Sequence, residues 1–264
     1  MEGLPPEIVD MVFDSIRPCD FHKKTLFSCS LVSKAWRAAA LKHCFHSLSL
    51  FSRIQSYPET CYFNSFVQDF VDSDIFATVK YFVQELTLKC GKIYGNHIEL
   101  DIVVYLHRFP ALRHLELSGR VHERLSPDIP PPVLPTSLST LTIIGRVGSA
   151  RGTDRTHNIK ALYDLLSLFR PVRHVYLRSF RHWDGNRLSS DLDVSLLPEL
   201  RSLTLHNLPV EPPLTGLLIC DPIVRCIERF ELNYETTFAG LALLQLCKPD
   251  IAHLTFALAS EECE

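Results

Sequence analysis

A six-residue pattern of apolar positions, apolar-x-x-apolar-x-apolar, recurs eight times along the chain. Within each copy the last two apolar residues are two positions apart, which is the period at which strand side chains return to one face of a sheet. Each copy therefore predicts a short strand with one apolar face. The eight copies are Phe45-Leu48-Leu50, Val83-Leu86-Leu88, Leu112-Leu115-Leu117, Leu138-Leu141-Ile143, Val172-Val175-Leu177, Leu200-Leu203-Leu205, Ile227-Phe230-Leu232 and Ile251-Leu254-Phe256.

The copies are spaced regularly enough to be structural repeats. Their middle residues run from position 48 to position 254, so that seven steps cover 206 residues, a mean of about 29. Apolar residues at helical spacing fill the intervals 98–109, 158–169 (with Asn158 as the expected N-cap) and 237–247, and 60–82 holds at least one more helix. Strands and helices in alternation predict a parallel sheet with helices outside it, in which stacked units share one core.

The first 46 residues follow a helical spacing instead. Pro5 and Pro6 suit the first turn of a helix, and Pro18 ends that helix. A second helical stretch runs over 26–45, and a break near Ser33 divides it, so that three short helices are predicted. Their apolar positions are Ile8, Val9, Val12, Phe13 and Ile16, followed by Leu26, Phe27, Leu31, Val32, Ala35, Trp36, Ala39, Ala40 and Phe45.

Two segments of this helical region resemble the F-box motif. The first is Leu-Pro-Pro-Glu-Ile-Val at 4–9, and the second is Leu-Val-Ser-Lys-Ala-Trp-Arg at 31–37. The family opens with Leu-Pro-x-Glu-Ile/Val and closes, at this separation, with Leu-Val-Cys/Ser-Lys/Arg-x-Trp. The resemblance covers about 45 residues, and it implies an F-box at 1–46 followed by a second domain at 47–264.

The F-box resemblance also implies a partner. Three helices of this size cannot bury all of their apolar faces alone, and in the family a Skp-type adaptor, which leads to a cullin-RING ligase, covers the remainder. Leu4 and Pro5 would form an exposed hook, whereas Trp36 would also anchor the motif to its own core or to the next domain. The residues expected at the adaptor interface are Leu4, Pro5, Ile8, Val9, Val12, Leu31, Val32 and Trp36.

The rest of the chain resembles the irregular leucine-rich-repeat domains that often follow an F-box, as in the divergent F-box proteins of mushroom-forming fungi. The resemblance implies an α/β solenoid with a parallel sheet on its concave face and helices outside. Side chains that alternate with the buried row would line the concave face and bind a target protein, with Tyr176 and Arg178 at its centre; ordinary solvated strand residues are the alternative. The candidates are His114, Glu116, His174, Tyr176, Arg178, Thr204, His206, Arg229 and Glu231.

Composition narrows the range of functions. Hydrophobic residues make up 46% of the chain and charged residues 22%, as in ordinary globular proteins, and a net charge of −3 provides no basic field for general nucleic-acid binding. The sequence shows no signal-peptide pattern and no apolar run of ~18 residues that could span a membrane. The nine cysteines are scattered without metal-ligand spacing, so we expect reduced thiols in a cytoplasmic or nuclear protein.

No motif for catalysis or for a cofactor occurs: P-loop, GxGxxG, GxSxG and HExxH patterns are absent. His114, His174 and His253 occupy the same place in three repeats, which indicates a shared face and not a catalytic cluster. We expect a non-catalytic substrate receptor of an SCF-type ubiquitin ligase, with no cofactor and no metal. The alternative is an interaction scaffold that does not direct ubiquitination, and an enzyme ranks third.

Overall fold

The computed structural model describes residues 4–15, 22–51, 69–89, 105–119, 133–145, 159–180, 193–206, 217, 226–233 and 252–257. The predicted helix over 237–247 and the expected N-cap Asn158 lie outside these ranges. Among the helices within them, none has the length and apolar character needed to cross a membrane.

The N-terminal region folds into the three predicted helices, α1 (Pro6–Ser15), α2 (His22–Cys29) and α3 (Lys34–Phe45). The predicted break near Ser33 is confirmed. Ser33 has an extended backbone, and its hydroxyl oxygen accepts a hydrogen bond from the Trp36 N–H at 3.3 Å. This N-cap satisfies one of the backbone donors that a helix leaves free at its start.

A small apolar core holds the three helices together. Phe13 of α1 and Leu26 of α2 are almost fully buried. The ring of Phe13 meets the ring of Trp36 edge to face, with 5.5 Å between the centroids, and such pairs contribute beyond the area that they bury. The buried members of this core are Val9, Phe13, Leu26, Ala40 and Cys44.

Eight parallel strands follow and pair in chain order, so the predicted parallel sheet is confirmed. The register places the middle apolar residue of each predicted repeat opposite that of the next, from Leu48 opposite Leu86 to Phe230 opposite Leu254. The strands are β1 (Ser47–Phe51), β2 (Glu85–Lys89), β3 (His114–Gly119), β4 (Thr140–Gly145), β5 (His174–Arg178), β6 (Ser202–His206), β7 (Arg229–Asn233) and β8 (His253–Ala257).

One backbone arrangement repeats where each strand begins. The carbonyl oxygen of the residue before a strand accepts two N–H groups from the next unit; that of His46 accepts from Gln84 at 2.9 Å and from Glu85 at 3.0 Å. The same pair of bonds recurs at the carbonyls of Gln84, Arg113, Ser139, Arg173, Arg201 and Glu228. These bonds satisfy the backbone donors that enter the sheet, and they hold the residue before each strand at an equivalent position in successive units.

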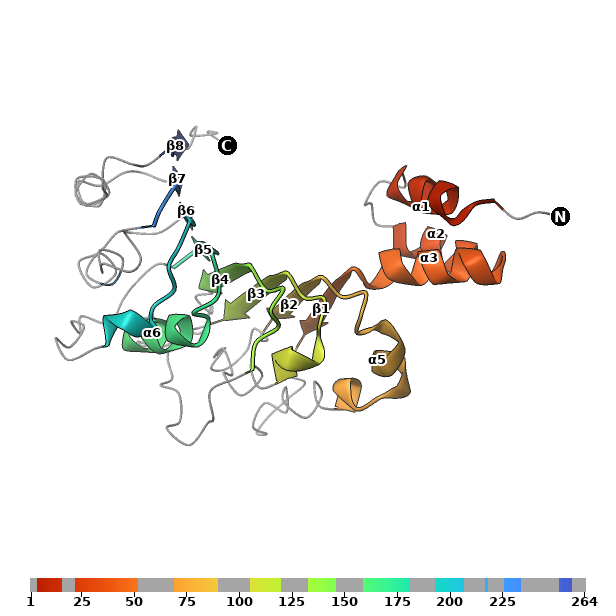
Figure 1. Ribbon diagram of the computed structural model, residues 1–264, viewed down its shortest axis with the longest axis horizontal. Helices are drawn as coiled ribbons and strands as arrows, with labels where there is room; N and C mark the ends of the chain where they lie inside the picture. The colour runs from red at the N-terminus through yellow and green to blue at the C-terminus, as the bar shows by residue number, and fades with distance from the viewer. Residues whose placement is uncertain are drawn as a thin grey trace, which may run out of the picture.

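One face of the sheet is buried, and helices cover it. In Figure 1 the row of strands bends from β5 to β8, with α5 (Asp74–Val79) and α6 (Ile159–Leu168) on the outer side of the bend. A short 3₁₀ helix, η2 (Val194–Leu196), precedes β6. The predicted helix over 98–109 ends, in its described part, as a 3₁₀ turn over 105–108, where Pro110 disfavours a helical conformation at the residue before it.

The two faces of the sheet are expected to contribute differently to stability. One face carries the row of buried apolar side chains, and we call the opposite face the open face. Leu141 is fully buried in the shared core, whereas its neighbour Thr142 points to the open face and is partly exposed. We expect Leu141→Ala to lower the free energy of unfolding by about 2–5 kcal/mol and Thr142→Ala to change it by no more than about 0.5 kcal/mol. Urea denaturation followed by circular dichroism measures both, and equal effects would contradict the assigned faces.

Candidate functional site

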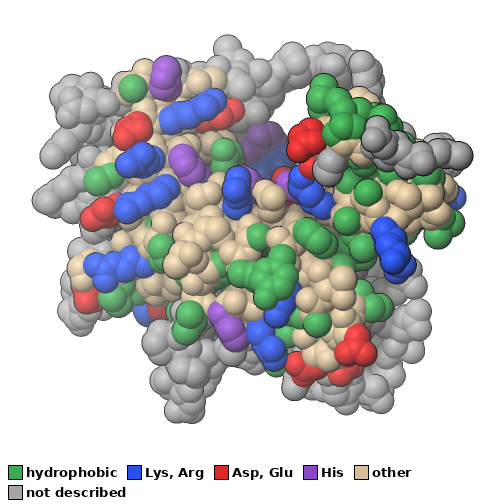
Figure 2. Space-filling model, turned by 45° about the vertical axis from the view of Figure 1, so that its right-hand side comes forward, with side chains coloured by type: hydrophobic (Ala, Val, Ile, Leu, Met, Phe, Trp, Pro, Cys, Tyr) green, Lys and Arg blue, Asp and Glu red, His purple; other side chains and the backbone are tan. Residues whose placement is uncertain are grey.

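Large apolar side chains are concentrated on the surface of the N-terminal helices. Of the eleven large hydrophobic residues that are exposed in the described ranges, seven lie between positions 4 and 32. Figure 2 shows such side chains, in green, over the helical unit at the upper right. Single exposed apolar residues are common on proteins, but a concentration of them marks an interaction site. We call this set the helical patch: Leu4, Ile8, Met11, Val12, Phe27, Leu31 and Val32.

The structure divides the predicted adaptor residues into exposed and buried groups. Val9 is only 1% exposed and belongs to the core together with Phe13, so it does not reach the surface where the sequence placed it. Val9 and Phe13 are four residues apart on the inner side of α1, and Ile8 and Val12 repeat at the same interval on its outer side. Trp36 is half-buried against Phe13. The exposed predicted residues are Leu4, Pro5, Ile8, Val12, Leu31 and Val32.

Met11 and Phe27 belong to the helical patch, although the F-box resemblance does not point to them. Met11 is 66% exposed and Phe27 is 49% exposed. Met11 lies three residues after Ile8, and Phe27 lies four residues before Leu31. Helix period could therefore have placed Met11 beside Ile8, whereas Leu31 lies in the turn that follows α2. Methionine and phenylalanine are both enriched in protein interfaces, which fits their place in the patch.

The connection between α2 and α3 presents Leu31 and Val32 in an ordered turn. The Leu31 N–H donates to the Ser28 carbonyl at 3.2 Å, and the Val32 N–H donates to the Cys29 carbonyl at 3.1 Å. The backbone of this turn is thus satisfied internally while both side chains point to solvent, at 86% and 66% exposure. An apolar surface that is ordered before binding loses less conformational entropy when a partner covers it.

Polar contacts between α1 and α3 help to fix the patch. Lys42 Nζ donates a hydrogen bond to Asp10 Oδ2 at 2.9 Å, and this bond lowers the pKa of the Asp10 carboxyl below its usual value. His43 lies 3.7 Å from a carboxylate oxygen of Asp10 and 3.7 Å from one of Asp14. Because the side chains of Lys42 and Asp10 are 49% and 38% exposed, solvent screens the pair and its contribution is small. The pair joins α1 to α3.

The open face carries the predicted target-binding residues in three rows that cross the strands. The strand register sets the rows, because the first, third and fifth residues of neighbouring strands are paired. The first row includes His114, Thr140, His174, Ser202 and Arg229, the second includes Glu116, Thr142, Tyr176, Thr204 and Glu231, and the third includes Ser118, Arg178 and His206.

Some short side chains of the open face are inaccessible. Thr204 is only 8% exposed, and Ser118 and Ser202 are buried as well. Thr204 lies between Tyr176 and Glu231 in its row, and these longer neighbours leave it little contact with solvent. Thr204 therefore offers almost no surface to a target, contrary to the sequence prediction. Tyr176 is half-buried, and Arg178, two residues further along β5, is exposed.

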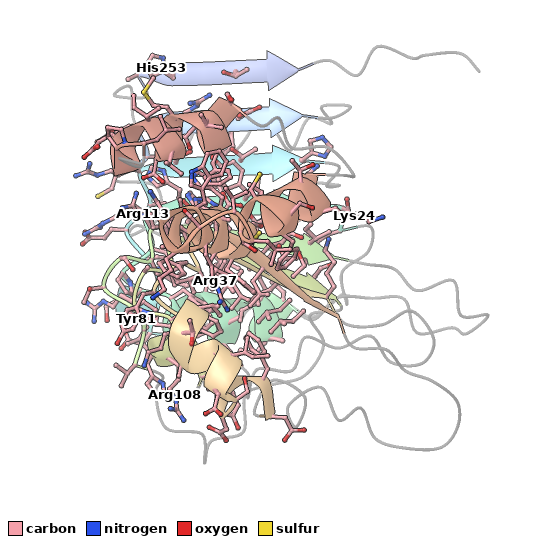
Figure 3. The ribbon with its side chains drawn as sticks, turned by 90° about the vertical axis from the view of Figure 1, so that its right-hand side faces the viewer. Lys24, Arg37, Tyr81, Arg108, Arg113 and His253 are labelled. Atoms are coloured by element: carbon pink, nitrogen blue, oxygen red, sulfur yellow. The ribbon has the colours of Figure 1, made fainter. Side chains whose placement is uncertain are left out.

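Basic side chains gather where the strands begin. Arg113, Arg173 and Arg201 directly precede β3, β5 and β6, Arg229 begins β7, and all four are exposed. Figure 2 shows Lys and Arg (blue) and His (purple) stacked on the side away from the helical unit, with Asp and Glu (red) among them. In Figure 3, Arg113 and His253 lie on the side from which the strands start. We define the amino edge as Arg113, His114, Arg173, His174, Arg201 and Arg229.

His174 reports the electrostatic environment of the amino edge. Burial lowers its pKa below the ordinary value of 6.5, and the positive charges of Arg201 and His114 lower it further. Glu228 acts in the opposite direction. The net direction shows that neither the nearby carboxylate nor solvent compensates for burial and the neighbouring positive charge at this imidazole.

The pKa of His174 provides a test of these assignments. We expect Arg201→Gln to raise that pKa, because removal of a nearby positive charge stabilises the imidazolium, and Glu228→Gln to lower it. Arg37→Gln, in α3, serves as a control that leaves it unchanged. A proton NMR titration of the imidazole resonance measures each value, and an unaltered pKa in the Arg201 variant would contradict the described geometry.

The described residues show no arrangement suited to a metal ion. Cys29, Cys44 and Cys226 are free cysteines. Within the part of the chain that the structure describes, no group of three or more His, Cys, Asp or Glu side chains could hold a metal.

Comparison with known proteins identifies the helical region. Residues 1–53 match the family model of the F-box domain, a segment that contains α1, α2, α3 and β1. No curated protein and no solved structure matches the chain. The remaining strands lie beyond the matched residues, so the leucine-rich-repeat resemblance stays a prediction. The N-terminal helices belong to an F-box domain, and the chain is accordingly an F-box protein.

Proposed function

We propose that this chain is a non-catalytic substrate-recognition subunit of an SCF-type ubiquitin ligase. F-box domains typically bind Skp-type adaptors in cullin-RING ligases, and here the F-box domain (1–46) would dock on the adaptor. The second domain (47–264) would hold a target protein. The observation that carries the first half of this proposal is the concentration of exposed apolar side chains in the helical patch.

The helical patch has the chemistry of a protein interface. Seven large apolar side chains lie exposed within residues 4–32, while the domain beneath them keeps a separate buried core. Covering such side chains removes apolar surface from water at roughly 25 cal/mol per Å². Glu7 and Asp14 are exposed on the same helix as Ile8 and Val12, and charged residues around an apolar centre are typical of interface rims.

For the second domain we propose an irregular leucine-rich-repeat-like solenoid whose open face is the target-binding surface. Eight in-register parallel strands in chain order support this architecture, because each unit then contacts only its neighbours. Tyr176 and Arg178 are of the residue types that dominate binding energy at interfaces. The chain would contribute to ubiquitin transfer by holding the target near the charged ubiquitin-conjugating enzyme, which is catalysis by proximity.

A pair of substitutions tests the adaptor interface. We expect Leu31→Ala combined with Val32→Ala to weaken binding of the full chain to a purified Skp-type adaptor by about tenfold or more, since truncation of central apolar contacts commonly costs 1 kcal/mol or more each. Isothermal titration calorimetry measures the affinity. Ile75→Ala is the matched control, because Ile75 is a comparably exposed apolar residue (62%) in α5, outside the F-box domain.

The same experiment separates binding from misfolding. Leu31 and Val32 are outside the F-box core, so the double variant should keep the circular dichroism spectrum of the wild-type chain. Adaptor binding that survives the double substitution, or that is lost equally in the Ile75 variant, would refute docking through the helical patch. Adaptor binding without ubiquitin transfer to any captured target, in a reconstituted cullin-RING reaction, would instead support the interaction scaffold.

A further inference from the structure

We propose that the amino edge of strands β3 to β7 binds an extended, acidic segment of the target protein. This inference deepens the proposed function, on which it rests, by naming the chemistry of the target. It assigns the binding to the residues that precede or begin the strands, whereas the sequence points to Tyr176 and Arg178 at the centre of the open face.

Three arginines of the amino edge have no ion-pair partner among the residues that the structure describes. Arg113, Arg201 and Arg229 are exposed, and among the described residues no carboxylate forms an ion pair with any of them. Arg173 is bound only to exposed Glu199, at 3.2 Å between Nη1 and Oε2, a pair that solvent screens strongly. A guanidinium presents a planar fork of donors that matches a carboxylate, so these groups are available to an acidic partner.

The spacing of the amino-edge residues fits an extended peptide that crosses the strands. Neighbouring strands lie about 4.8 Å apart, so the four steps from β3 to β7 span roughly 19 Å. An extended chain advances about 3.3 Å per residue, so a segment of about six residues covers the row. The paired backbone hydrogen bonds at the carbonyls of Arg113, Arg173 and Arg201 hold these positions in register, which gives the peptide a fixed set of charges to meet.

The surroundings of His174 agree with this charge distribution. Arg201 and His114 act on it as positive neighbours, and Glu228 acts as a negative one. All three groups come from the beginnings of separate strands, β6, β3 and β7, or from the residue just before. An acidic segment bound over this region would place negative charge beside Arg201 and His114.

The carboxylates within the row favour a peptide over a nucleic acid. Glu199, which pairs with Arg173, and Glu228, which directly precedes Arg229, lie among the arginines of the amino edge. A nucleic acid carries a phosphate at every nucleotide and would place some of these beside carboxylates. A peptide can alternate acidic and neutral residues and so avoid the repulsion, and the chain as a whole is acidic, with a net charge of −3.

Fluorescence anisotropy with defined peptides tests the inference on the full chain. The probe is a fluorescein-labelled octapeptide of alternating Glu and Ser, and the comparison peptide alternates Gln and Ser. We expect the acidic probe to bind and the neutral one not to bind. Binding should weaken as salt rises, because the contacts are exposed charges. Arg113→Gln with Arg201→Gln should reduce the affinity for the acidic probe about tenfold, whereas Arg37→Gln, on exposed α3 of the F-box domain, should not.

Three results would overturn the inference: no binding of the acidic probe, an equal loss in the Arg37 variant, or tighter binding of a single-stranded oligonucleotide of the same charge. An unchanged circular dichroism spectrum shows that the Arg113/Arg201 variant is folded, and its retention of the Skp-type adaptor, measured in parallel, shows that the F-box domain is intact. That measurement also separates the two proposals. If the wild-type chain binds the adaptor but not the acidic peptide, only the inference about the amino edge fails. If the wild-type chain does not bind the adaptor, the proposed function fails.

Discussion

The sheet depends on one constraint: no strand unit can bury its own apolar row, so each must be covered by its neighbours and by the helices outside. The parallel register satisfies this constraint at every step, because it stacks Leu86 on Leu115, Leu115 on Leu141 and so on through the sheet. The helix α6 closes the same core, with Leu162 and Leu166 fully buried beside the strands. A slip of one residue would turn this apolar row toward solvent.

The same constraint is met differently in the F-box domain, and the difference leaves an apolar surface for the proposed adaptor. Three short helices bury Phe13, Leu26 and a few small side chains, but the domain is too small to enclose its remaining apolar residues. Those residues stay on the surface as the helical patch, which is the proposed adaptor interface. Only His46 separates α3 from β1, so docking of the helices would position the sheet and whatever it holds.

The sequence alone predicted the strands with their correct phase, because a two-residue period and a repeated motif leave one choice of buried face. The sequence alone predicted less well which side chains are exposed on the helices and on the open face. Val9 and Val12 belong to the same apolar stripe, and only packing against Phe13 and α3 shows which of them is buried. Thr204 was predicted as accessible because alternation ignores the size of its neighbours. The alternation of strand side chains does not point to Arg113, Arg173 and Arg201, because these residues precede the strands, and their common position follows from backbone hydrogen bonds.

The central claim is that adaptor docking uses the helical patch and leaves the open face and amino edge free for a target. Hydrogen–deuterium exchange of the full chain, with and without a purified Skp-type adaptor, measures this claim most directly. Added protection should be confined to α1 and to residues 26–32, with the strand beginnings of β3 to β7 unchanged. Protection of those strand beginnings by the adaptor, or no protection of α1, would contradict the account.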